Sequence, residues 1–188
     1  MPIRFNLEPY KNKIFVETGT YHGKGCINAI KSGFKTVYSI EVSEAILQIA
    51  IQNIKNEPDL DAKVELYLGN SADVLSDILE KIDEPATFWL DGHGEAAYAL
   101  NMTNCPLYEE LDIIEKHHIK DHTIMIDDLR IIRDIHGELH LHSWGQYNIT
   151  EQGVMDKLKK INPDYEFAYE DGEIPGDCLV AYIKDKKP

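Results

Sequence analysis

The sequence predicts an α/β protein built on a doubly wound, mostly parallel sheet. Short apolar segments typical of buried strands alternate with amphipathic segments typical of helices across residues 13–126. Polar or glycine-containing turns follow the strands. Near its end the chain changes to two strand-like segments joined by a short turn-rich segment, which is typical of an antiparallel hairpin.

The alternating part of the chain contains five expected strands with helices between them. The strands are expected at residues 13–17, 36–40, 64–68, 86–90 and 123–126. The helices are expected at residues 23–32, 43–54 with Ser43 as the cap, 72–82 and 107–118. Strands that alternate with helices at these lengths favour a parallel sheet with helices on both faces.

The last part of the chain follows a different order. A helix is expected at 150–161 with Thr150 as its N-cap, followed by strands at 165–170 and 179–183. This hairpin predicts an antiparallel edge and seven strands in all. The pattern therefore predicts a single Rossmann-like domain over residues 1–188. A stretch of weak periodicity at about 129–149 is expected to be an insertion over the carboxyl edge of the sheet, where ligands bind in such folds.

Composition and charge narrow the class of partner. The chain has 19 Lys plus Arg against 33 Asp plus Glu, a net charge of −14. Such a charge repels polyanions at long range, so no nucleic-acid partner is expected, and a neutral substrate with a cationic cofactor suits it better. No apolar run approaches the roughly 20 residues that span a bilayer, so no membrane association is expected.

The cysteines and the first residues indicate the compartment. Cys26, Cys105 and Cys178 are widely spaced and form no CxxC pair, which favours small buried side chains over disulfides or a zinc site. The first ten residues contain no apolar signal segment. We therefore expect a cytoplasmic protein, and a homodimer is possible.

The turn after the first expected strand, residues 17–25, decides between kinds of cofactor. A phosphate-binding P-loop fails, because Lys24 occupies the position of its second glycine. The dinucleotide pattern GxGxxG fails because Tyr21 stands two residues after Gly19. The remaining pattern is acidic Glu17, then Gly19 and Gly23. A carboxylate opposes a pyrophosphate but suits a cofactor that carries an ammonium group.

This turn resembles the first motif of the class I S-adenosylmethionine-dependent methyltransferases: a hydrophobic strand, an acid, x-Gly, and a glycine four residues later. Glu41, at the end of the second strand, stands where such folds place an acid for ribose hydroxyls, although it could equally be a helix-entry charge. The segment 70–72 stands where the family contacts adenine, or is a helix cap. The resemblance covers roughly residues 13–128. It implies S-adenosylmethionine as the cofactor, contacted by Glu17, Thr18, Gly19, Thr20, Tyr21, Gly23, Glu41, Asn70, Ser71, Ala72 and Asp91.

Three aspartates follow two neighbouring strands. Asp91 ends the fourth strand, and Asp127 and Asp128 end the fifth. Because these strand ends lie side by side in a parallel sheet, the three carboxylates should converge, and their mutual repulsion would raise their pKa values. A hard divalent cation such as Mg²⁺ would resolve this repulsion. The alternative is that one Asp caps a helix while the others are solvated.

The arrangement is similar to the Mg²⁺-dependent sugar O-methyltransferases that modify macrolide and aminocoumarin antibiotics. That resemblance implies Asp91, Asp127 and Asp128 as metal ligands. Residues 88–93 and 105–107 also resemble small methyltransferases of bacteria and large viruses. The antibiotic enzymes carry an N-terminal segment that helps to cover the substrate, whereas here the first strand begins at about Lys13.

The resemblance and the residues together suggest a mechanism. Hydroxyl groups beside Mg²⁺ lose a proton more easily, and Asp91 or His93 could accept it. In the expected insertion, His136, His140 and Trp144 are candidates for substrate binding; a plain exposed loop and a zinc site formed by His140 and His142 are the alternatives.

The expected function is O-methylation of a hydroxyl on a sugar, glycan or similar small molecule with vicinal hydroxyls, with S-adenosylmethionine and Mg²⁺. The alternatives are a metal-independent methyltransferase of a protein or nucleic acid, and a non-catalytic module that binds S-adenosylmethionine. Fold alone does not decide among them.

Overall fold

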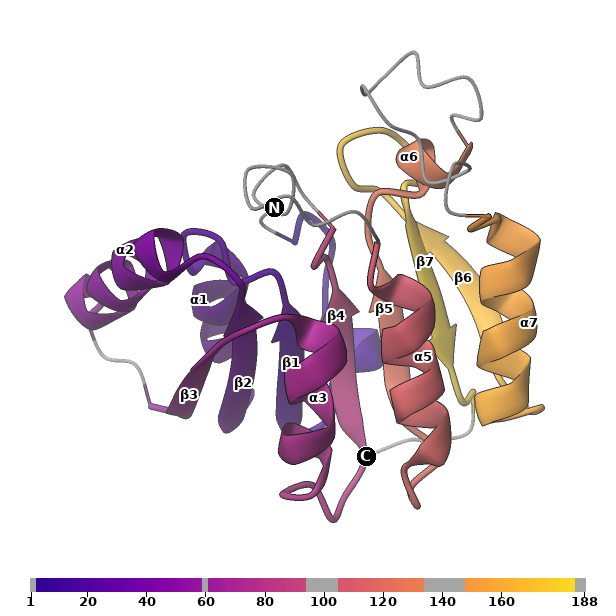
Figure 1. The fold of residues 1–188 in the computed structure, drawn as a ribbon, viewed down its shortest axis with the longest axis horizontal. Helices are drawn as coiled ribbons and strands as arrows, with labels where there is room; N and C mark the ends of the chain where they lie inside the picture. The colour runs from indigo at the N-terminus through magenta and orange to yellow at the C-terminus, as the bar shows by residue number, and fades with distance from the viewer. Residues whose placement is uncertain (1–2, 59–60, 94–104, 134–147, 185–188) are drawn as a thin grey trace.

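The computed structural model describes residues 3–58, 61–93, 105–133 and 148–184. Within these residues one seven-stranded sheet has the strand order β3-β2-β1-β4-β5-β7-β6 (Figure 1). The strands are β1 (Ile14–Thr18), β2 (Thr36–Glu41), β3 (Lys63–Leu68), β4 (Ala86–Leu90), β5 (Thr123–Ile126), β6 (Glu166–Glu170) and β7 (Cys178–Tyr182). Strands β1 to β5 pair in parallel, and β7 pairs antiparallel with both β5 and β6. The predicted fold class is confirmed.

The five predicted helices are confirmed to within a few residues. They are α1 (Lys24–Lys31), α2 (Glu44–Asn56), α3 (Ser71–Leu79), α5 (Leu107–Lys116) and α7 (Glu151–Ile161). Two short helices, η1 (Glu8–Tyr10) and α6 (Leu129–Arg133), were not predicted. The two predicted caps are confirmed: Ser43 Oγ accepts from the Ile46 amide at 3.5 Å, and Thr150 Oγ1 accepts from the Gly153 amide at 3.0 Å. These bonds satisfy amides that have no partner inside the helix.

Each face of the sheet packs against its own set of elements. Val16 and its counterparts on other strands contact a cluster that includes Leu75 of α3, Leu111 of α5 and Leu158 of α7. Figure 1 shows these three helices side by side over that face. The opposite face packs against α1, α2 and the N-terminal segment. Side chains that alternate along β1 therefore enter two different cores.

The order of the strands places a crevice between β1 and β4. From β1 the chain moves outward through β2 and β3, whereas β4 lies on the other side of β1 and continues the sheet toward β5. In open α/β sheets the connections at such a reversal leave on opposite faces, which opens a binding crevice at the carboxyl ends of the two strands. The candidate site lies at this point.

The first residues of the segment predicted as an insertion belong to a helix that packs into the core. Residues Leu129–Arg133 form the short helix α6, and its apolar side chains Leu129, Ile131 and Ile132 are buried in the core. Residues 134–147, the rest of the predicted insertion, lie outside the described residues. Among the helices that the structure describes, none combines the length and apolar character that a bilayer crossing requires.

Candidate functional site

The turn after β1 lies against the end of β4. Gly19 has φ +85°, and a Cβ added to it would lie 2.3 Å from the carbonyl oxygen of Asp91. Only glycine permits this close approach of two backbones. Gly23 (φ +79°) then begins α1 as its N-cap, and between them Tyr21 is half exposed with φ +47°. The predicted turn therefore lies at the carboxyl ends of β1 and β4, in contact with the backbone of Asp91.

Glu17 is buried beneath α1 and faces away from the turn's open side. Its Oε2 accepts a hydrogen bond from Ser39 Oγ at 2.7 Å and one from Cys26 Sγ at 3.1 Å. A Cβ on Gly25 would lie 1.7 Å from Glu17 Oε1, so the glycine makes room for the carboxyl group. Burial raises the pKa of Glu17 to about 7, although the bonds from Ser39 and Cys26 oppose that rise. Glu17 thus supports the turn from below.

Glu41 at the end of β2 joins the turn to the next helix. Its carboxylate accepts hydrogen bonds from the amides of Tyr21 at 2.8 Å and Ser43 at 3.0 Å. Each oxygen keeps a further lone pair. The two interpretations of Glu41, as a ligand-binding acid and as a charge at a helix entry, are therefore compatible with each other.

The segment after β3 forms the start of α3. Asn70 Oδ1 accepts from the Ala72 amide at 3.1 Å, so Asn70 is the helix cap. Ser71 is buried beside it. The helix-cap interpretation of this segment is confirmed, and its predicted contact with a cofactor stays a prediction.

The acids after β4 and β5 form two groups that overlap at Asp128. Asp91, His93 and Asp128 offer ligand atoms within 4.8 Å of one another, and so do Asp127, Asp128 and Asp177. His93 Nε2 lies 3.5 Å from Asp128 Oδ2 and 3.9 Å from Asp91 Oδ1. The structure therefore brings the predicted acids to one edge of the sheet, with His93 between two of them.

The charges in this group are only partly compensated. Burial, together with the charges of Asp91 and Asp128, raises the pKa of Asp127 to about 7. Burial also raises the pKa of Asp91. Burial alone would raise the pKa of Asp128, but His93 and Arg130 lower it to about 2. Asp128 thus remains ionised, while its two neighbours hold protons more readily than ordinary aspartates do.

Two further residues join the acidic group, and the sequence interpretation missed both. The Arg130 guanidinium contacts Asp128 and Asp177. Asp177 is fully buried and also accepts from the backbone amides of Arg130 at 2.9 Å and Glu173 at 3.1 Å. A signal for Asp177 was available: the residue before an antiparallel last strand must lie at the carboxyl end of its neighbour β5.

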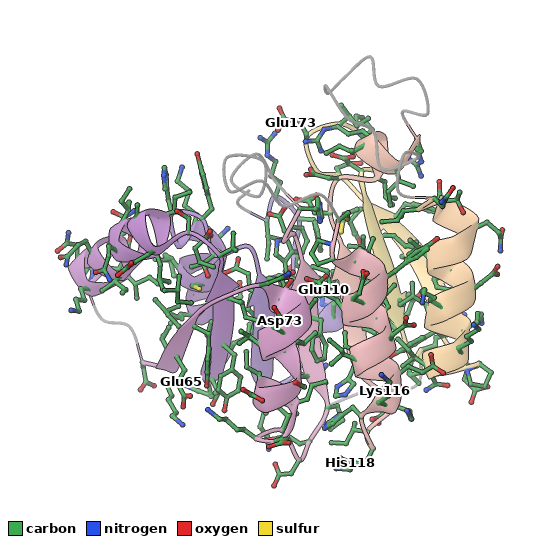
Figure 2. All side chains as sticks on the ribbon, in the orientation of Figure 1. Glu65, Asp73, Glu110, Lys116, His118 and Glu173 are labelled. Carbon is green, nitrogen blue, oxygen red and sulfur yellow. The ribbon has the colours of Figure 1, made fainter. Side chains whose placement is uncertain are left out.

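Glu110 is a second buried acid that the sequence interpretation missed. It lies on α5 (Figure 2), and the residue is 0% exposed. Its carboxyl group reaches the ends of β1 and β4, since a Cβ on Gly92 would lie 3.2 Å from Glu110 Oε1. The signal was a charge on the apolar face of a helix: Leu107, Leu111 and Ile114 occupy the same side of α5.

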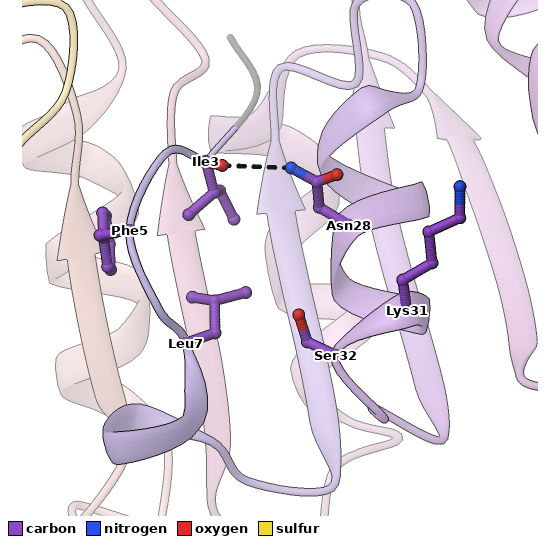
Figure 3. A pocket seen from close by; sticks show the side chains of 6 residues that line it. All are labelled: Ile3, Phe5, Leu7, Asn28, Lys31 and Ser32. Carbon is purple, nitrogen blue, oxygen red and sulfur yellow. Dashed lines mark hydrogen bonds between the residues drawn. The ribbon is translucent and has the colours of Figure 1, made fainter.

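The predicted substrate-binding residues His136, His140 and Trp144 lie outside the described residues. A separate pocket lies between the N-terminal segment and α1, where Asn28 donates to the Ile3 carbonyl at 3.2 Å (Figure 3). It is lined by Ile3, Phe5, Leu7, Asn28, Lys31 and Ser32. None of these residues belongs to the predicted site.

Comparison with known proteins gives structural but not sequence relatives. No family model matches the chain, and no curated protein matches its sequence. Among solved structures, the O-methyltransferase TomG from Streptomyces achromogenes, involved in tomaymycin synthesis and solved in complex with S-adenosylmethionine, aligns with a TM-score of 0.57 and 13% identity. The alignment covers 91% of this chain and 73% of TomG.

Two further structures give the same result. A putative O-methyltransferase from Klebsiella pneumoniae aligns with a TM-score of 0.62 and 15% identity over 94% of this chain and 76% of that one. An O-methyltransferase from Bacillus cereus, in complex with S-adenosylhomocysteine, aligns with a TM-score of 0.58 and 20% identity over 92% and 74%. At these identities the likeness concerns the fold. The chain therefore has the fold of the class I S-adenosylmethionine-dependent methyltransferases.

Proposed function

We propose that the chain is an S-adenosylmethionine-dependent O-methyltransferase that acts, with Mg²⁺, on a hydroxyl group of a sugar, glycan or similar small molecule. One observation carries this proposal: the glycine turn after β1 touches the backbone of Asp91, where the acidic group at the ends of β4 and β5 begins. A cationic cofactor held at the turn would lie directly beside the acids. The O-methyltransferases of the same fold support the reaction class.

The acids of the site are of the kind that binds a magnesium ion, and Asp128 is shared by two groups, one with Asp91 and His93 and the other with Asp127 and Asp177. Asp91, Asp127 and Asp128 present carboxylate oxygens, which Mg²⁺ prefers. Burial is the largest cause of the raised pKa values of Asp91 and Asp127, and the charge of Asp128 adds to both. These three aspartates would hold the ion. When bound, Mg²⁺ lowers the pKa of a hydroxyl group beside it, since a cation favours the ionised form.

The chain's own residues carry the other parts of the proposed reaction. Glu41 and the turn at Gly19 hold the cofactor across the crevice. Asp91 accepts the proton of the acceptor hydroxyl, and His93 lies beside it to share that proton. Arg130 keeps Asp128 ionised and in place through its ion pair. A vicinal diol suits this arrangement, because two adjacent hydroxyls can face the acidic group together.

Calorimetry tests the proposal most directly. The purified protein is titrated with S-adenosylmethionine, first with Mg²⁺ and then with EDTA. Methyl transfer to nucleotide sugars and deoxysugar glycosides is assayed under the same two conditions. We expect cofactor binding in both conditions and transfer only with Mg²⁺. Transfer that persists in EDTA would remove the metal from the proposal, and the absence of cofactor binding would remove the function itself.

A further inference from the structure

Glu110 lies where three parts of the candidate site meet. Its carboxyl group is next to Gly92, which follows β4, and a Cβ on Gly92 would lie 3.1 Å from Thr18 Oγ1 at the end of β1. The hydroxyl of Ser71, at the start of α3, is also close enough to influence its pKa. The residue comes from α5, so its position depends on a helix and not on a loop. A carboxyl group is thus fixed beneath the ends of β1 and β4.

Among the residues that the structure describes, none forms a hydrogen bond with either oxygen of this carboxyl group. The hydroxyls of Ser71 and Thr18 and the ring of His93 only partly oppose the rise in pKa that burial causes. These three groups therefore do not replace a well-aligned hydrogen-bond donor to the Glu110 carboxyl group. Buried carboxyl groups without donors are costly, and most buried polar groups in proteins are paired.

The packing around Glu110 gives no structural reason for an acid at this position. The other residues on this side of α5, Leu107, Leu111 and Ile114, belong to the hydrophobic core. An apolar side chain of similar size would fill the same space without the desolvation of a carboxyl group. A residue that lowers stability in this way is typical of a functional site, where a ligand supplies the missing partner.

We propose that Glu110 binds the cofactor by accepting a hydrogen bond from one of its N–H groups, a role that rests on the proposed function. S-adenosylmethionine offers two such groups, the amino group of adenine and the ammonium of the methionine part. Both groups belong to a ligand that would lie next to Thr18, Ser71 and Gly92. The carboxyl group receives the donor that the protein itself does not provide.

Three ligands separate the two sources of the N–H group. S-adenosylhomocysteine carries both groups. S-inosylhomocysteine has an oxo group in place of the adenine amino group, and a deaminated analogue of S-adenosylhomocysteine lacks the ammonium. Each is titrated by calorimetry into the wild type, Glu110→Gln and the matched control Glu109→Gln, which removes the same charge from an exposed neighbour on α5.

We expect Glu110→Gln to weaken S-adenosylhomocysteine about tenfold, the loss expected for one charge-assisted hydrogen bond. Glu109→Gln should leave the affinity within about twofold. If adenine provides the N–H group, the wild type's preference for S-adenosylhomocysteine over S-inosylhomocysteine should shrink about tenfold in Glu110→Gln. If the ammonium provides it, the penalty for the deaminated analogue should shrink instead.

A second variant separates a binding role from a folding role. Glu110→Leu should raise Tm in the absence of ligand, because it removes an unpaired buried carboxyl group, and should weaken S-adenosylhomocysteine at the same time. Wild-type affinity for S-adenosylhomocysteine in Glu110→Gln or Glu110→Leu would overturn the inference while leaving the proposed function intact. Failure of the wild type to bind S-adenosylhomocysteine would instead overturn both.

Discussion

Buried titratable groups lie at both ends of β4 and β5, but their hydrogen bonding differs between the amino ends and the carboxyl ends. At their amino ends, two histidines form a chain in which each hydrogen bond has a defined donor. The Ala86 amide donates to His122 Nδ1 at 3.0 Å, so His122 carries its proton on Nε2, which donates to His117 Nδ1 at 2.9 Å. His117 Nε2 then donates to the Ile82 carbonyl at 3.2 Å.

At the carboxyl ends of the same strands the polar groups are not balanced. Burial raises the pKa values of Asp91 and Asp127, and within the described part of the chain neither oxygen of Glu110 has a hydrogen-bond partner. Asp128 also has a left-handed backbone, with φ +62°. An L-residue other than glycine pays for that conformation unless its surroundings fix it.

This difference separates folding from function along the same two strands. Neutral histidines with fixed tautomers stabilise the amino ends and need no ligand. The carboxyl ends hold charge and strain that a cation and a cofactor would relieve. Substitutions at the first end should therefore change stability, and substitutions at the second should change binding and rate.

The largest expected effect is on the rate. Asp91→Asn keeps the shape of the side chain but removes the proposed proton acceptor and a proposed metal ligand, so we expect methyl transfer to fall by about 10² to 10⁴. Stability should not fall, because one of several mutually repelling acids becomes neutral. The measurement is the initial rate of methyl transfer, with Tm recorded in parallel. Asp164→Asn, at an exposed acid far along the chain, is the control.

Wild-type turnover in Asp91→Asn would contradict the assignment of a catalytic role to the carboxyl ends of β4 and β5. A fall in both rate and Tm would indicate that Asp91 serves mainly to hold β4 and the turn together.

The second effect is on stability. His122→Ala leaves the Ala86 amide and His117 Nδ1 without their partners and opens a cavity beside Phe88, whose ring centroid lies 5.0 Å from that of His122. We expect a loss of about 3 kcal/mol in the free energy of unfolding, or roughly 10 °C in Tm. Urea unfolding measures it.

The exposed neighbour His118 provides the matched control. His118→Ala should change the free energy of unfolding by less than about 0.5 kcal/mol. Cofactor affinity should be unchanged in the folded fraction of His122→Ala. A selective loss of affinity there would couple the two ends and contradict their separation.

The sequence predicted the fold well where apolar runs have clear limits. The limits of β4 and β5 agree with the prediction because each run ends in acids, Asp91 or Asp127, that cannot continue a buried strand. The segment after β5 was harder, since Leu129, Ile131 and Ile132 look like part of an irregular stretch until the core that receives them is known.

The site was predicted less completely than the fold. Spacing along the chain placed Glu17 at the end of β1, but strand alternation sends its side chain beneath α1, on the face opposite that of Thr18. Arg130 follows β5 and Asp177 precedes β7, and their side chains form an ion pair. This contact depends on the pairing of β5 with β7, which the local sequence does not determine. Glu110 did carry a local signal, because it is a charged residue on the apolar face of a helix. That signal points to a functional residue only once the structure shows that Glu110 is buried.

The third prediction concerns pH at the carboxyl ends. Burial raises the pKa of Glu17 from 4.5 to about 7, so the unfolded chain releases this proton at a lower pH than the folded protein does. The stability that Glu17 contributes is therefore complete below about pH 4.5 and is lost as the pH rises through 7. A change of this size corresponds to roughly 3 kcal/mol, as an upper limit.

Glu17→Gln cannot titrate, yet its carbonyl can still accept from Ser39 and Cys26. Urea unfolding between pH 5 and 8 should therefore show a steeper decline in the wild type than in the variant, in which the raised pKa of Asp127 still contributes. Parallel curves for the two proteins would mean that Glu17 is ionised in the folded protein throughout this range.

The smallest effect concerns the amino ends and has the opposite sign. Burial, aided by His118, lowers the pKa of His117 below 6.5, so the unfolded chain binds this proton first. Stability is complete above about pH 6.5 and is lost as the pH falls below it. His117→Gln, which can still accept from His122 and donate to Ile82, should lose less stability between pH 7 and 5 than the wild type does. The two titrations overlap between pH 5 and 6.5, so the double variant Glu17→Gln/His117→Gln tests their independence. If its change in the stability profile equals the sum of the changes in the two single variants, the two ends titrate independently. A sum that fails would mean that the acids and the histidines share one network, and the separation between the ends would fail.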